Sequence, residues 1–111
     1  MGKKIRTYSS RTSQALRLLA SLIKAARKRK GWSEAELAER CDTTRGTVRK
    51  IEQGKPGTEI GLYFEIANLL GIPLLAEDSG DLSEIQKRVD LELSVLPQRV
   101  RTRSEEVFDD F

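Results

Sequence analysis

The chain has 111 residues, a third of them charged, with no histidine, one cysteine and one tryptophan. This length supports one helical core with terminal arms, and the composition offers almost nothing for metal binding or nucleophilic catalysis, so we expect no enzyme, metal or cofactor. Residues 1–55 hold 15 Lys and Arg against 5 Asp and Glu, a net charge of +10, whereas residues 56–111 hold 5 against 12, a net charge of −7.

This division of charge predicts different partners for the two halves. A cationic half can neutralise the phosphates of a nucleic acid, whereas the acidic half suggests either a protein partner or simple solubility. Cys41 has no second cysteine to pair with, which suits a reducing compartment, so we expect a cytoplasmic protein. Every apolar run is too short and too charged to span a membrane.

The first predicted helix covers residues 13–30 and follows a polar, cationic arm at residues 1–12. The arm lacks the apolar stretch of a signal peptide; it could contact DNA phosphates or the minor groove, or it could be disordered. One face of the helix carries Leu16, Leu19, Ile23 and Ala26. Cations at residues 27–30 favour the negative end of the helix dipole, and Gly31 follows.

Two short helices joined by a tight turn come next. Ser33 and Glu36 have the spacing of a capping box at the start of the first helix. Its inward face carries Leu37, Ala38 and Cys41. Asp42 suits the turn because its side chain bonds to nearby backbone, and Thr44 is a good N-cap for the second helix.

The second of these helices has two contrasting sides. Its outer side carries Arg45, Gly46, Arg49, Lys50 and Gln53. Val48 and Ile51 occupy the inner side with Glu52 beside them, and Gly54 lies where a C-terminal glycine is expected. An amphipathic surface helix with solvated charges is the alternative, but caps, turn and charge together are typical of a helix-turn-helix, whose second helix enters the major groove of DNA.

A fourth helix is predicted over residues 59–70, after a loop at residues 55–57 and with Thr58 as its N-cap. Its apolar positions are Ile60, Tyr63 or Phe64, Ala67 and Leu70. Asp81 and Glu84 open a last helix that runs to roughly residue 94. Its apolar stripe carries Leu82, Ile85, Val89, Leu93 and Leu96, and Pro97 ends it.

The predicted domain organisation follows from these elements. It comprises the basic arm (1–12), the helix-turn-helix domain (13–75), a C-terminal helix for dimerisation (76–97) and a flexible tail (98–111). Because a lone last helix cannot bury its whole stripe, we expect a homodimer; packing within one subunit is the alternative. The tail is first basic and then acidic with two Phe, which would suit either a partner's groove or solubility alone.

Residues 19–71 resemble the Xre family, the helix-turn-helix domain of the lambdoid phage repressors. The matching residues are Leu19, Ile23, Ala26, Arg27, Gly31, Leu37, Ala38, Thr44, Thr47, Val48, Ile51, Glu52, Gly54, Lys55, Leu69, Gly71 and Ile72. The resemblance implies an all-α fold of five helices, and an ion pair between Arg27 and Glu52; two solvated side chains are the alternative. The chain departs from the family at two positions. At Glu34 the family usually has Gln, which supports a phosphate contact, whereas a carboxylate would repel the phosphate. At Asp42 the family usually has Gly, so the turn must rely on the tolerance of Asp for the left-handed region.

Three motifs stand out in the downstream half: Pro56-Gly57-x-x-Ile60-Gly61, Leu69-Leu70-Gly71-Ile72 and Leu96-Pro97-x-Arg99-Val100-Arg101. They resemble a subgroup of that family, the HipB-type proteins. Such proteins are usually encoded beside HipA-like serine/threonine kinase toxins; they dimerise, repress their own operon and help to hold the kinase inactive. The resemblance therefore implies a repressor whose partners are DNA, a second copy and a HipA-like kinase. A free-standing repressor without a toxin, or an adaptor with the same fold, is the alternative.

Site residues can be assigned on the second helix of the helix-turn-helix and around it. Arg45 lies at its N-terminal end and is predicted to contact a guanine edge, with Lys50 as the next base contact and Gly46 allowing close backbone approach. Contacts to phosphates, which position the protein without specifying sequence, are predicted for Ser33, Thr44, Thr47, Arg49 and Lys55. A twofold dimer would place these helices about 34 Å apart on a palindromic operator.

Overall fold

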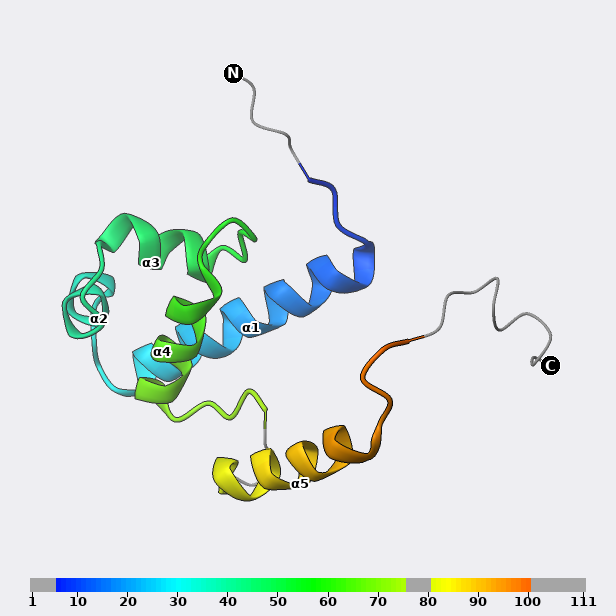
Figure 1. The fold of residues 1–111 in the computed structure, drawn as a ribbon. Coiled ribbons are helices and arrows are strands. Elements are labelled where there is room, and N and C mark those ends of the chain that lie inside the picture. Colours follow the sequence, from blue (N-terminus) through cyan, green and yellow to red (C-terminus); the bar gives the residue numbers. More distant parts are fainter. Residues whose placement is uncertain (1–5, 76–80, 101–111) are drawn as a thin grey trace. The chain divides into compact units, whose positions relative to one another are not determined.

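The computed structural model describes residues 6–75 and 81–100, which form five α-helices and no β-strand (Figure 1). The helices are α1 (Ser10–Arg29), α2 (Glu34–Arg40), α3 (Arg45–Glu52), α4 (Ile60–Leu70) and α5 (Leu82–Val95). The predicted all-α fold class is therefore confirmed. None of the described helices combines the length and the apolar character needed to cross a membrane.

The chain divides into two compact units, one ending at Leu75 and the other beginning at Ala76. The first unit contains α1 to α4, and the second contains α5. Residues 1–5 of the predicted arm and residues 101–111 of the predicted tail lie outside the described residues, as do residues 76–80.

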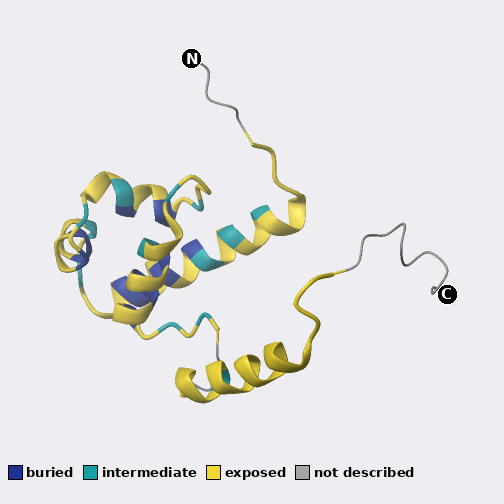
Figure 2. Ribbon diagram, in the orientation of Figure 1, coloured by how far each residue is buried: buried dark blue, intermediate teal, exposed yellow. Residues whose placement is uncertain are grey.

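The helices α1 to α4 enclose one hydrophobic core. α3 packs against both α2 and α1, and α1 also packs against α4. In Figure 2 the buried residues lie on the sides of these helices that face one another. The most completely enclosed side chains are Ile23, Leu37, Val48, Ile51 and Ile66. Burial of an aliphatic side chain of this size contributes about 1.5–3 kcal/mol, so this core holds α3 firmly in place.

Two helix starts differ from the predictions. α1 begins at Ser10 rather than at residue 13, because the Ser9 hydroxyl accepts a hydrogen bond from the Thr12 backbone N–H at 3.2 Å. Residues 10–12 therefore belong to α1 and not to the arm. The prediction that Thr58 caps α4 is wrong, because Glu59 occupies the N-cap position and makes no side-chain capping hydrogen bond.

The inward face of α4 also differs from the prediction at one end. Tyr63, Ala67 and Leu70 are buried, but Ile60 is 71% exposed. Helical side chains tilt toward the N-terminus of their helix, so the first residue of α4 points past the end of the helix. Ile66, which the apolar pattern did not single out, is fully enclosed instead.

The helix α5 is capped by Asp81, whose carboxylate accepts a hydrogen bond from the Ser83 backbone N–H at 3.0 Å. None of the residues in α5 is buried, and Figure 2 draws nearly all of them as exposed. Within the predicted dimerisation stripe, Ile85 is half-buried and the other residues are exposed: Leu82, Val89, Leu93 and Leu96. Leu96 is the C-cap of α5, and Pro97 follows it.

Candidate nucleic-acid interface

The first helix of the helix-turn-helix is fixed at its start by reciprocal capping. The Ser33 hydroxyl accepts a hydrogen bond from the Glu36 backbone N–H at 3.0 Å, and the Glu36 carboxylate accepts one from the Ser33 backbone N–H at 2.8 Å. The predicted capping box is therefore confirmed. Since the Ser33 hydroxyl only accepts in this arrangement, its hydrogen remains available to donate to a phosphate.

The turn between α2 and α3 depends on a left-handed residue. Asp42 has φ of 56°, as expected for an aspartate in the place where the related family has glycine. The chain then enters α3 through Thr44, whose hydroxyl accepts a hydrogen bond from the Thr47 backbone N–H at 3.1 Å. The N-cap predicted at Thr44 is confirmed, and it leaves the Thr44 and Thr47 side chains beside each other, with their hydroxyl oxygens 3.0 Å apart.

A buried ion pair joins α1 to α3. Arg27 donates from Nε to Glu52 Oε2 at 2.7 Å and from Nη2 to Glu52 Oε1 at 3.0 Å, while its Nη1 donates to the Trp32 carbonyl at 2.8 Å. The two side chains are only 8% and 2% exposed. The hydrogen bond to Glu52 raises the pKa of the Arg27 guanidinium above its ordinary value, although burial opposes this shift. This planar, two-bond geometry fixes the orientation of α3 relative to α1.

The outer side of α3 is cationic and exposed, whereas its inner side is apolar and buried. Val48 and Ile51 have no exposed surface, so the helix is held by its apolar side. Arg45, Arg49 and Lys50 are consequently exposed on the other side. At Gly46, a Cβ atom would meet only the Thr44 hydroxyl oxygen, at 3.9 Å. Packing within the chain therefore leaves room for a larger residue at Gly46.

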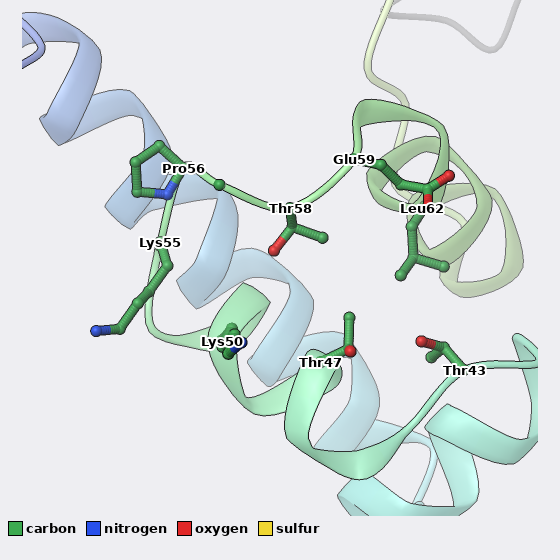
Figure 3. Close-up of a pocket in the computed structure, with 9 residues that line it drawn as sticks. Thr43, Thr47, Lys50, Lys55, Pro56, Thr58, Glu59 and Leu62 are labelled. Atoms are coloured by element: carbon green, nitrogen blue, oxygen red, sulfur yellow. The ribbon is translucent and has the colours of Figure 1, made fainter. Parts of the chain in front are cut away.

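Beside α3 lies an open hollow of about 520 Å³ (Figure 3). It is lined by Thr43, Thr47, Lys50, Lys55, Pro56, Gly57, Thr58, Glu59 and Leu62. Thr47 and Thr58 face each other across it in Figure 3. The two lysines and three threonine hydroxyls of this lining suit a phosphate group. The carboxylate of Glu59 would repel such a group. The sequence did not single out Thr43 or Thr58 as phosphate contacts. The loop that carries Thr58 folds back toward α3, and sequence periodicity does not predict such a contact between elements.

The loop between α3 and α4 is held in place by Tyr63. Its hydroxyl donates a hydrogen bond to the Lys55 carbonyl at 2.8 Å. Burial raises the pKa of Tyr63 above its ordinary value, which keeps the phenol protonated and able to donate. Lys55 is thereby positioned at the rim of the hollow.

One acidic side chain contacts the cationic side of α3 directly. The Glu34 carboxylate, at the start of α2, lies 3.2 Å from Arg49 Nη2 and 3.7 Å from Arg45 Nε. Burial would raise the pKa of Glu34, but the hydrogen bond from Arg49 and the charges of Arg49, Arg27 and Arg45 together lower it. Sequence reasoning treated Glu34 only as a carboxylate that repels phosphate, because the angle between α2 and α3 could not be read from spacing.

Comparison with known proteins finds similar sequences. Residues 23–76 match the Helix-turn-helix family model. Antitoxin HipB of Escherichia coli O6:H1 (strain CFT073) is 28% identical over 75 residues, which cover 67% of this chain and 80% of that protein. A solved complex of a HipB variant with an O2 20mer is 26% identical and covers 70% of this chain and 100% of that one, with a TM-score of 0.48. These likenesses support an Xre-like helix-turn-helix regulator that is similar to the HipB antitoxins.

Proposed function

We propose that this chain is a homodimeric transcriptional repressor that binds a palindromic DNA operator, with α3 in the major groove. The observation that carries the proposal is the two-sided environment of α3. Val48, Ile51 and Glu52 anchor the helix in the core, whereas its cations stand exposed on the opposite side. A rigidly held helix with a cationic outer face is what recognition of base edges requires.

Three residues of α3 are assigned to contacts with bases. Arg45 is the first residue of the helix and is 63% exposed, so a guanine edge can reach its guanidinium and accept two hydrogen bonds from it. Lys50, five residues further along, is the second base contact. Gly46 lies between them on the same side, and the absence of a side chain there lets the backbone approach the groove.

The phosphate contacts surround this helix. Ser33 and Thr44 present hydroxyls at the starts of α2 and α3. Thr47 and Lys55 line the hollow beside α3, and Arg49 extends from the middle of the helix. Such contacts set the register of the protein on the duplex and supply affinity that depends on salt.

Dimerisation is assigned to α5. Four residues of the predicted stripe lie on α5, a helix without a buried residue, and the fifth is its C-cap: Leu82, Ile85, Val89 and Leu93, followed by Leu96. An apolar stripe of this kind is stable in water when a second copy covers it, and a twofold axis would set the two α3 helices about 34 Å apart, one turn of DNA.

The relation to HipB extends the proposal to a toxin–antitoxin operon. On this proposal the chain represses its own operon and binds a HipA-like serine/threonine kinase toxin, with the acidic tail (98–111) as a contact. Co-purification of such a kinase with the full chain, weakened by deletion of residues 98–111, would support this partner. A chain that binds its operator but no kinase would instead be a free-standing repressor.

The decisive experiment compares two arginines on α3. Arg45→Ala should cost about 1–3 kcal/mol at the preferred site and relax the preference at one base position, because it removes a base contact. Arg49→Ala should weaken all duplexes alike and reduce the salt dependence, because it removes a phosphate contact. Selection from a random duplex pool, followed by titration at several salt concentrations, measures both effects.

Lys24→Ala is the matched control, since it removes an exposed cation from α1 rather than from α3. It should leave the base preference unchanged. An unaltered preference in Arg45→Ala would show that α3 does not read bases through this residue.

A further inference from the structure

We propose that Glu34 is a specificity-determining residue, which engages Arg45 and Arg49 in the free protein and so weakens their attraction to phosphates at non-cognate DNA. The inference rests on the proposed DNA-binding function. It assigns a role to a residue outside the predicted interface, and it follows from how α2 and α3 pack.

The geometry is that of one oxygen shared by two cations. Glu34 Oε1 accepts a hydrogen bond from Arg49 Nη2 at 3.2 Å and lies 3.7 Å from Arg45 Nε. Arg45 and Arg49 are four residues apart, so they stand on successive turns of the same side of α3. The side chain of Glu34 is 20% exposed, against 63% for Arg45 and 52% for Arg49. The carboxylate is therefore held by the fold, while the arginines keep access to solvent.

The chemistry of the two DNA targets makes this contact selective. A phosphate is an anion, so it competes with Glu34 for the arginines and is also repelled by the carboxylate at distances within about 8 Å. The guanine edge presents neutral acceptors, N7 and O6, which the carboxylate opposes far less. Glu34 should consequently penalise binding that depends on phosphates alone more than binding that includes a base contact from Arg45.

The test replaces Glu34 with its neutral isostere. Glu34→Gln keeps the shape of the side chain and an acceptor for Arg49, so the fold should be retained. We expect its affinity for a duplex of scrambled sequence to rise about 2- to 5-fold, the range of an exposed ion pair. Affinity for the preferred duplex should change less, so the ratio of the two affinities should fall. The salt slope on scrambled duplex should steepen by roughly one unit.

Two controls separate this mechanism from a general change in charge. Glu39→Gln removes the same charge from an exposed position of α2, and no ion pair to Glu39 occurs among residues 6–75 and 81–100. It should leave the ratio of affinities unchanged. In an Arg45→Ala/Arg49→Ala background, Glu34→Gln should have a clearly smaller effect on scrambled duplex, because only the direct repulsion between the carboxylate and phosphate then remains.

An unchanged ratio in Glu34→Gln, or an equal fall in Glu39→Gln, would overturn the inference while leaving the proposed function intact. The proposed function fails separately if the parent protein itself shows no preference among duplexes.

Discussion

The two described regions of this protein, residues 6–75 and residues 81–100, are both helical but are stabilised in different ways. In the first, α1 to α4 enclose a shared core and a buried ion pair. In the second, α5 has 14 residues, a side-chain cap and no buried residue. An isolated helix of this length is marginal in water. The first region therefore holds α3 with its own residues, whereas we propose that a second copy of the chain covers the apolar stripe of α5.

The largest test of this contrast removes α5. A chain ending at Ser79 should still fold, because the core of the first unit lies wholly before residue 76. It should be monomeric, and its affinity for the palindromic site should fall by about 10²–10⁴-fold, since two linked half-sites are replaced by one. Sedimentation equilibrium and operator titration measure these outcomes. A truncated chain that stays dimeric would move the dimer interface into the first unit.

The next test removes the buried ion pair of the first region. Arg27→Met leaves the Glu52 carboxylate buried without its cation, and should lower the free energy of unfolding by about 3–5 kcal/mol. Lys28→Met, at an exposed neighbouring position, should change it by less than about 0.5 kcal/mol. Denaturant titration compares the two variants. If Arg27→Met/Glu52→Leu recovers none of the loss, the isolated carboxylate is not its cause.

Local patterns in the sequence predicted the helix-turn-helix well because its helix starts are determined by near neighbours, although they missed the starts of α1 and α4. The capping box at Ser33 and Glu36, the N-cap at Thr44 and the left-handed Asp42 each involve residues close in the chain. The inward face of α3 also follows from periodicity, since Val48 and Ile51 are both fully enclosed.

The contacts that the sequence did not predict depend on how helices and loops meet. The contact of Glu34 with Arg45 and Arg49 requires the angle between α2 and α3, and the place of Thr58 in the hollow requires the path of a loop. Ile60 has the spacing of a core residue, but its position at the start of α4 leaves it exposed. Spacing identifies a face; it does not show how far along the helix that face is covered.

A smaller test separates folding from DNA binding within the first region. Gly46→Ala should raise the free energy of unfolding by up to about 1 kcal/mol, because alanine favours a helix and the Cβ has room. The same methyl group should weaken operator binding if the backbone approaches the groove there. Gly61→Ala, also within a helix and with its nearest contact at 3.8 Å, should stabilise without affecting binding. Stronger operator binding by Gly46→Ala would exclude close approach.

The smallest expected effect concerns the start of α5. The Ser83 hydroxyl donates to Asp81 Oδ1 at 2.8 Å and the Ser83 backbone N–H donates at 3.0 Å, and these two bonds lower the pKa of Asp81 below its usual value of 3.8. A lowered pKa in the folded state means that the ionised cap stabilises α5 above about pH 3.8, and that this contribution is lost as the pH falls through the lower folded value. The first turn of α5 should therefore fray on acidification, with faster amide exchange at its first residues than in the core around Val48. Asp81→Asn keeps a capping oxygen but has no proton to gain, so its first turn should fray little over the same range. Equal fraying in both proteins would show that protonation of Asp81 does not cause the acid sensitivity.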